Sequence, residues 1–126
     1  MQCNVVGGGI SKTFVEPDKF TIGTNFHCMW ANLIFAVDEP MLRELLSKTN
    51  KLIFTTPKVA PKYRRTGRVF EFDSKRHYNT NSLSSGLNAI CLANQMGFDT
   101  LYLFGFENRL EQLGQIQDIE KKYIFR

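Results

Sequence analysis

The sequence predicts an α/β protein, a three-layer domain in which a mostly parallel sheet lies between helices. Three apolar segments carry this prediction, and small or acidic residues follow or end each of them: Val5–Ser11, Leu33–Asp38 and Leu101–Phe104. The first segment runs into a glycine-rich turn, and a helix that opens with serines precedes the third. Strands that lead into loops and helices build an open parallel sheet, whose ligands bind at the carboxyl ends of the strands.

Length and composition indicate one domain over residues 1–126. A chain of 126 residues fits the usual ~100–200 residues per domain. Its hydrophobic fraction of 43% supplies enough apolar surface for a core and argues against disorder. No window reaches the ~18 consecutive apolar residues of a membrane span, and no signal peptide opens the chain. We therefore expect a soluble, cytoplasmic protein without a membrane partner.

The cysteines and histidines indicate no metal site. Cys3, Cys28 and Cys91 are odd in number and far apart, without a zinc or thioredoxin-type spacing. His27 and His77 lie too far apart in the sequence to form a recognisable ligand pair. We expect the three cysteines to be buried, reduced thiols.

The first half of the chain alternates between short strands and turns. Its apolar segments have the composition of buried strands: residues 4–6, 20–24, 31–37 and 51–56. Asp38 is the expected N-cap of a helix that has Pro40 in its first turn. The apolar face of this helix recurs at helical spacing: Met41, Leu42, Leu45 and Leu46.

The second half begins with a basic segment, residues 58–77. It contains seven cations and two acids, and its prolines and lack of periodicity predict a loop to about Arg68. A short strand, plausible at a sheet edge, follows at 69–72, and 73–82 is polar and irregular. The cations either draw phosphates to a site or form a solvated loop.

A helix, a strand and a second helix complete the prediction. The first helix has apolar or small residues at helical spacing and ends at Gly97: Leu83, Leu87, Ile90, Cys91 and Asn94. A strand at 100–104 and a turn at 105–107 follow. The last helix has an apolar stripe: Leu110, Leu113, Ile116 (or Gln117) and Ile119 (or Glu120).

The order of these motifs resembles the Rossmann-like domain of glycosyltransferase family 42 sialyltransferases and 6-hydroxymethylpterin diphosphokinase-like proteins. Those proteins have a Gly-Asn-Gly-Pro-Ser turn, an Asn-x-Phe element, a Thr-Ser-Gly or Gly-Ser helix start and a strand ending in Gly-x-Asp. The corresponding segments lie within residues 4–107: Gly7–Ser11, Thr24–Phe26, Ala36–Asp38, Ser84–Gly86 and Gly97–Glu107. The resemblance implies a nucleotide or nucleotide-sugar ligand and, if the chain is an enzyme, glycosyl or diphosphoryl transfer.

The resemblance also implies which residues bind the ligand. The glycine turn and its serine would lie against phosphate or ribose, an asparagine against base or ribose, and a helix start would offer hydroxyl and N–H groups. The residues concerned are Gly7, Gly8, Gly9, Ser11, Asn25, Asp38, Ser84, Ser85 and Gly86. Physical chemistry agrees, because glycine lets the backbone approach an anion and a helix N-terminus attracts one.

The sequence departs from the family pattern at Gly8, Ile10 and Glu107, where the family has asparagine, proline and aspartate. In the sialyltransferases a later region forms a lid with the catalytic histidine and tyrosines, and we expect this chain to be truncated before it. Glu107 and His77 are then the candidate catalytic residues, and His27 is expected in the core. Asp38 and Glu107 could together hold Mg²⁺, which prefers oxygen ligands.

Structural interpretations stand beside these functional ones. The glycines can form a plain tight turn and Asn25 an Asx turn, and Asp38 and either Ser84 or Ser85 can be helix caps. Three functions therefore stay open: a small transferase, a non-enzymatic nucleotide-binding module, and nucleic-acid binding through residues 58–77 and their aromatic side chains. The last is the least expected, and a second copy of the chain could complete a half-built site in a homo-oligomer.

Overall fold

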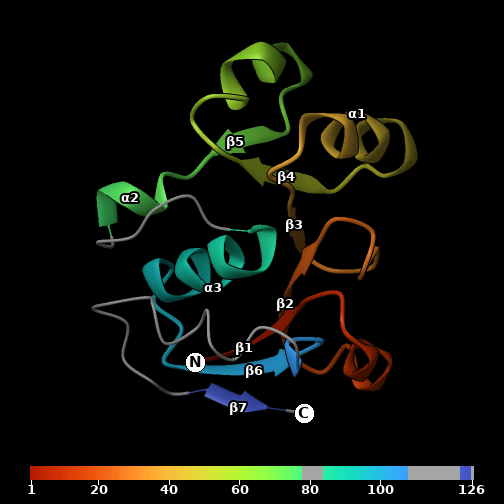
Figure 1. Cartoon of the computed structure of the whole chain (residues 1–126), viewed down its shortest axis with the longest axis vertical. Coiled ribbons are helices and arrows are strands. Elements are labelled where there is room, and N and C mark those ends of the chain that lie inside the picture. Colours follow the sequence, from red (N-terminus) through yellow and green to blue (C-terminus); the bar gives the residue numbers. More distant parts are fainter. Residues whose placement is uncertain (78–83, 108–122, 126) are drawn as a thin grey trace.

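The computed structural model describes residues 1–77, 84–107 and 123–125 and is built around one seven-stranded sheet (Figure 1). The strand order is β5-β4-β3-β2-β1-β6-β7, and every neighbouring pair is parallel. The strands are β1 (Gln2–Val6), β2 (Phe20–Thr24), β3 (Leu33–Phe35), β4 (Leu52–Thr55), β5 (Val69–Glu71), β6 (Thr100–Phe104) and β7 (Tyr123–Phe125). The predicted α/β class is confirmed.

The strand order reverses once, between β1 and β6. The chain steps outward from β1 to β5 and then returns to place β6 against the other side of β1, with Val6 opposite Phe104. Because all strands are parallel, their carboxyl ends share one edge, and the reversal opens a crevice between the loops that leave β1 and β6.

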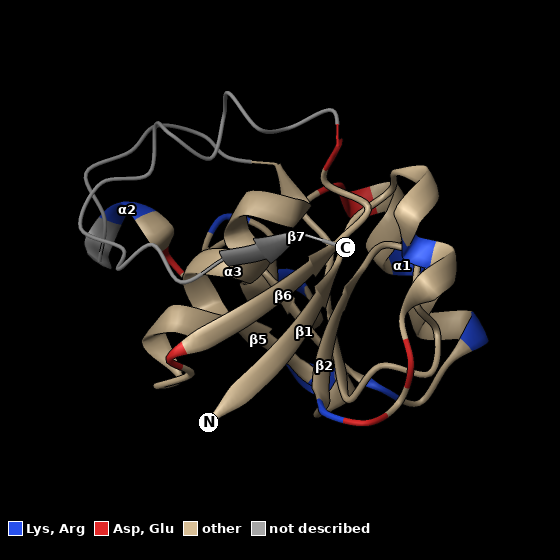
Figure 2. Ribbon diagram, turned by 90° about the horizontal axis from the view of Figure 1, so that it is seen from below, with Lys and Arg blue, Asp and Glu red and all other residues tan. Residues whose placement is uncertain are grey.

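The sheet is apolar because it is covered on both faces. Strands β1 to β4 and β6 contain no Lys, Arg, Asp or Glu, and the charged residues lie mainly on helices and loops (Figure 2). Buried parallel strands are typically near-continuous apolar runs. No helix in the described part of the chain has the length and apolarity needed to cross a membrane.

Helices α3 (Ser85–Gln95) and α1 (Glu39–Lys48) pack on opposite faces of the sheet (Figure 1). The main core, between α3 and the sheet, includes Cys3, Val5, Ile22, Phe35, Ile90 and Leu103. A second cluster lies under α1 and includes Ile34, Leu42, Leu45 and Ile53. Alternate residues of β3 point into different clusters, which fixes its register between the two helices.

Caps define where α3 begins. The Ser84 hydroxyl accepts a hydrogen bond from the Leu87 backbone N–H at 3.4 Å, so of the two serines predicted as caps Ser84 is the N-cap. Asp38 stands at the N-cap position of α1, as predicted, but its side chain makes no capping hydrogen bond. Gly97, which follows α3, has a φ of +97°, in the left-handed region that ends many helices.

Short helices account for most differences from the sequence predictions. Residues Ala60–Thr66 form the 3₁₀ helix η2 instead of a loop, because Val59 and Ala60 are buried in the α1 cluster and anchor the segment. Residues Ile10–Phe14 form a further 3₁₀ helix, η1, and Ser74–His77 form the one-turn helix α2 in a stretch predicted to be irregular. The helix predicted after residue 107 lies outside the described residues.

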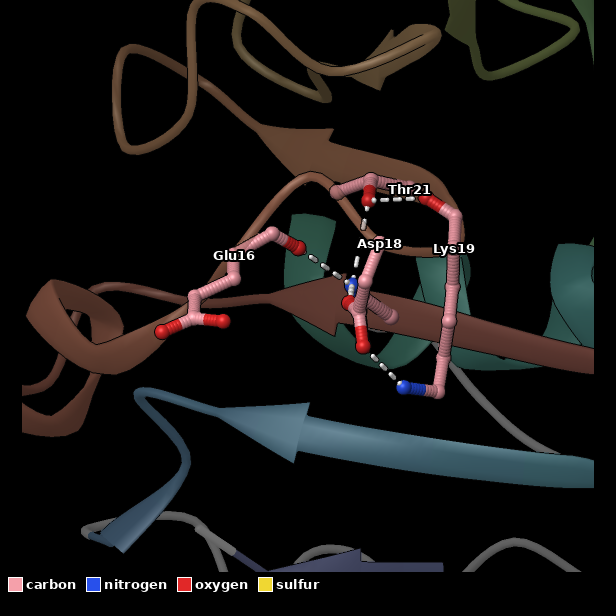
Figure 3. A network of polar contacts seen from close by, with 5 residues as sticks. Glu16, Asp18, Lys19 and Thr21 are labelled. Carbon is pink, nitrogen blue, oxygen red and sulfur yellow. Dashed lines mark hydrogen bonds and ion pairs between the residues drawn. The ribbon is translucent and has the colours of Figure 1, made fainter.

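A polar network ties the loop between η1 and β2 to the middle of the sheet (Figure 3). The buried Asn4 donates through Nδ2 to the Glu16 carbonyl oxygen at 3.1 Å and to Thr21 Oγ1 at 3.3 Å. Lys19 pairs with Asp18 at 2.6 Å beside them. A polar side chain inside a strand is tolerated here because it is hydrogen-bonded.

Candidate functional site

A cavity of about 120 Å³ lies at the strand reversal. The ends of β1, β2 and β6 and the start of α3 line it: Gly7, Gly8, Thr24, Asn25, His27, Ser84, Ser85, Gly86, Gly105 and Phe106. Most of the binding residues expected from the sequence are therefore brought together, although they come from segments far apart in the chain. The cavity lies at the carboxyl edge of the sheet, where ligands of open α/β folds bind.

The loops after β1 and β6 are joined through their backbones. The Gly7 N–H donates to the Phe104 carbonyl oxygen at 2.7 Å, and the Gly9 N–H donates to the Gly105 carbonyl oxygen at 2.9 Å. Gly105 has a φ of +81°, and a Cβ there would lie 2.5 Å from the Gly7 oxygen. A glycine is therefore required for the close approach that shapes the floor of the cavity.

Asn25 connects the end of β2 to the start of α3. Its φ of +51° is uncommon for a residue other than glycine. Its Oδ1 accepts a hydrogen bond from Ser85 Oγ at 3.4 Å, and Ser85 Oγ accepts one from the Val37 N–H at 2.9 Å. A backbone held in this region at a cavity wall often marks a functional residue.

Gly9, Ser11 and Glu107 are absent from the cavity lining, and Ser11 and Glu107 are hydrogen-bonded to each other beside it. Ser11 Oγ donates to the Glu107 carboxylate and accepts from the Gly105 N–H at 2.7 Å. The Ser11 N–H donates to Glu107 Oε2 at 3.4 Å. The Ser11 hydroxyl is the main reason why the pKa of Glu107 lies below its ordinary value. Glu107 is thus an ionised group that ties the β6 loop to η1.

Asp38 and His77 are the remaining predicted residues. Asp38 is exposed at the start of α1, and His77 is the last residue of α2. Among the residues that the structure describes, no group of three or more His, Cys, Asp or Glu could hold a metal ion. The Mg²⁺ site at Asp38 and Glu107 stays a prediction.

A larger cavity of about 690 Å³, which the sequence did not indicate, lies at the carboxyl ends of β3, β4 and β5. Its lining combines lysines and acids with apolar groups: Val37, Glu39, Thr56, Pro57, Lys58, Val59, Lys62, Phe72, Asp73, Ser74, Lys75 and Asn88. It adjoins the smaller cavity at the start of α3, where Asn88 Nδ2 donates to the Ser84 carbonyl oxygen at 3.0 Å. Several loops assemble it, so no single motif could reveal it.

Part of the basic segment stabilises the fold. The Arg68 guanidinium donates to the carbonyl oxygens of Leu46 and Thr49, at the carboxyl end of α1, where a cation is favourable. Lys62 pairs with Glu39 at 3.0 Å, and Tyr63 and Lys62 together hold the pKa of Glu39 below its ordinary value. These cations belong to local networks.

His27, which was expected in the core, is half-buried in the wall of the smaller cavity. The backbone turns directly after β2, where the His27 N–H donates to the Thr24 carbonyl oxygen at 3.0 Å. This turn places the imidazole at the carboxyl edge of the sheet. The apolar neighbours in the sequence, Phe26 and Cys28, gave no indication of it.

Comparison with known proteins shows a sialyltransferase-like fold. No family model matches the chain, and no curated protein matches it in sequence. The solved structures that match include the sialyltransferase CST-II in complex with a trisaccharide acceptor and CMP, with a TM-score of 0.57 and 12% identity over 83% of this chain. They also include CstII from Campylobacter jejuni in complex with a substrate analogue, cytidine-5'-monophosphate, with a TM-score of 0.60 and 13% identity over 98% of this chain. The chain covers 62% and 78% of those two proteins.

Proposed function

We propose that this chain binds a nucleotide or nucleotide sugar at the crevice between β1 and β6. The observation that carries the proposal is the meeting of the glycine turn, Asn25 and the start of α3 in one cavity at the strand reversal. Backbone that glycine leaves open and the N-terminus of an eleven-residue helix are both suited to a phosphate. Asn25 and Ser85 add polar side chains to the wall of the same cavity.

The two adjoining cavities suggest which part of the ligand each of them binds. A volume of about 120 Å³ suits a phosphate group, whereas small-molecule sites usually measure roughly 300–1,000 Å³. The neighbouring cavity of about 690 Å³ offers room for the nucleoside or sugar. In this arrangement the phosphate lies between Gly8 and the start of α3, and the rest of the ligand extends past Val37.

The matched structures favour a cytidine nucleotide as ligand and glycosyl transfer as reaction, because both are sialyltransferases solved with CMP. Binding and transfer are separate proposals for this chain, since it covers 62% of the length of one of these enzymes. A non-enzymatic binding module would bind the nucleotide without turnover.

Thermal unfolding with added ligands tests the proposal. Purified protein is heated with CMP, CMP-linked sugars, other nucleotides and pterins, with and without Mg²⁺. A ligand at ~100 times its Kd stabilises the folded state by about 2.7 kcal/mol, so a selective rise in Tm is expected for one nucleotide class. The absence of a shift with every nucleotide would contradict the proposal.

Variants then locate the site. Ser85→Ala is expected to weaken nucleotide binding, because the Ser85 hydroxyl organises Asn25 and Val37. Ser47→Ala, an exposed serine on α1, is the matched control and should bind like the wild type. If Arg65→Ala abolishes binding while Ser85→Ala does not, the ligand lies on the basic segment instead. Release of sugar from the bound nucleotide, with an added acceptor, distinguishes a transferase from a binding module.

A further inference from the structure

His27 and Lys12 form a pair beside the smaller cavity. Lys12 lies on η1 and His27 in the loop after β2, and Lys12 Nζ is 3.1 Å from His27 Nδ1. Both side chains are partly buried. The two loops that contribute them follow β1 and β2, so the pair lies at the same edge of the sheet as the glycine turn.

The pairing determines which nitrogen of His27 carries the proton. A lysine ammonium has three donors and no acceptor, so Nδ1 must accept the hydrogen bond from Lys12. In a neutral imidazole with Nδ1 as acceptor, the proton is on Nε2. Lys12 therefore selects the tautomer in which Nε2 is a donor.

The Nε2 edge of His27 lies over Gly8. A Cβ placed on Gly8 would be 2.9 Å from Nε2 and 3.2 Å from Cε1, so any side chain at position 8 would collide with the ring. Gly8 is exposed, and no partner for Nε2 is found within the described residues. The Nε2–H group of His27 is thus a hydrogen-bond donor that faces the glycine turn and is available to a ligand.

Burial and a neighbouring positive charge favour the neutral form of His27. Burial, followed by the positive charge of Lys12, lowers the pKa of His27 below 6.5. The Glu107 carboxylate, in the loop after β6, accepts hydrogen bonds from Ser11. The wall of the cavity therefore presents a neutral N–H donor backed by a lysine cation.

We propose that His27 Nε2–H donates a hydrogen bond to a phosphate oxygen of the ligand above Gly8, and that Lys12 is the positioning residue that fixes this tautomer. The inference rests on the proposed nucleotide site, and it identifies His27 as a group that forms a hydrogen bond with the phosphate. His27 acts as a donor and not as a base, because Nε2 already carries a proton and Lys12 occupies Nδ1.

Calorimetric titration with CMP and with cytidine tests the proposal, because the two differ only in the phosphate. His27→Leu is expected to weaken CMP binding about tenfold or more, the usual loss when a hydrogen bond to a charged group is removed. Cytidine affinity, measured directly or by displacement of CMP, should change less than about twofold, within the scatter of distant substitutions. His27→Gln, whose amide N–H reaches near the Nε2 position, should recover most of the CMP affinity.

Lys12→Met tests the positioning role, and Arg64→Met, which removes an exposed cation on η2, is its matched control. Lys12→Met should weaken CMP binding and also change the nitrogen NMR spectrum of His27, from the Nε2–H tautomer to a mixture. The chain has two histidines, so the signal that disappears in His27→Gln assigns the spectrum. A purely structural role for Lys12 would leave the tautomer unchanged.

The outcomes separate this inference from the proposed function. If the wild type binds no nucleotide, the proposed function is wrong and this inference falls with it. If the wild type binds CMP and His27→Leu binds it equally well, the nucleotide site stands and the role of His27 is wrong. An Nδ1–H tautomer in the wild type would also overturn the inference.

Discussion

Asn25 combines a demanding backbone conformation with a polar side chain at the cavity. Its φ of +51° is tolerated because asparagine enters the left-handed region more readily than other residues with a Cβ. Its Oδ1 accepts from Ser85, which in turn receives the Val37 N–H. The backbone requirement and the side-chain role can therefore be separated by substitution.

Replacing Asn25 with glycine keeps the backbone conformation and removes the amide. We expect Asn25→Gly to weaken nucleotide binding about tenfold, a typical loss of one hydrogen bond to a ligand, with unfolding free energy close to the wild type. Asn25→Ala should bind equally weakly and also lose about 1–2 kcal/mol of stability, because a positive φ is unfavourable for alanine. Titration calorimetry and urea unfolding measure the two effects. Wild-type affinity in Asn25→Gly would show that the side chain does not touch the ligand.

The buried thiols of Cys3 and Cys91 link stability to alkaline pH. Burial raises the pKa of each to about 12 from an ordinary value of 9.0. The folded state therefore keeps its protons where the unfolded state loses them, so stability is fully present below pH 9 and falls between pH 9 and 12. The loss at pH 10 is about 1.4 kcal/mol per thiol.

Urea unfolding at pH 8 and pH 10 measures this effect. The matched control is Cys3→Ala/Cys91→Ala, which lacks both buried thiols and should lose less stability over the same interval. Equal losses in the control and the wild type would assign the alkaline destabilisation to other groups. The same burial predicts that neither thiol reacts with a thiol reagent at pH 8 until the protein unfolds.

The helices and strands that could be predicted are those whose start and end are both marked by residues in the local sequence. Strand β2 was predicted with its observed bounds, and α3 has both a serine cap and a glycine just beyond its end. Helix η2 was missed because it is held in place by Val59 and Ala60, whose burial under α1 cannot be recognised from the sequence. Short helices held by tertiary contacts have no periodicity to detect.

The candidate site was predictable to the same degree. The order of motifs pointed to Gly8, Asn25 and Ser85, which line one cavity. His27 was assigned to the core because apolar residues flank it in the sequence, whereas the turn after β2 brings it to the cavity wall and its partner Lys12 comes from another loop. The second cavity is formed by side chains from several loops, so no motif in the sequence predicts it.

The turn after β6 tests how tightly the two glycine loops meet. Gly105 and Gly67 have similar positive φ values, +81° and +75°, but a Cβ at Gly67 would meet nothing within 4 Å. Both alanine variants incur the cost of the left-handed conformation, about 1–2 kcal/mol. Gly105→Ala should lose clearly more, because its Cβ would lie 2.5 Å from the Gly7 oxygen. Equal unfolding free energies in urea would show that the loops can separate at little cost.

For the whole molecule, the sheet order predicts a gradient of local stability. Strands β1 and β2 have a neighbour on each side, and Cys3, Val5 and Ile22 on them belong to the main core, whereas β5 lies at an edge and exposes Phe70. Local opening is easiest where few buried contacts hold the backbone. Amide hydrogen exchange should therefore be slow in β1 and β2 and clearly faster in β5. Equal protection of β5 and β1 would contradict this gradient.

The pairing of Gln2 with Thr100 also constrains the order of events during synthesis. Strand β6 leaves the ribosome roughly 5–20 seconds after its partner β1 at ordinary translation rates of ~5–20 residues per second. Until then one side of β1 has exposed hydrogen-bonding groups, which makes the nascent chain a target for chaperones. The cavity at the carboxyl ends of these two strands therefore forms only after β6 has been synthesised, and a ligand can stabilise it only from that point on.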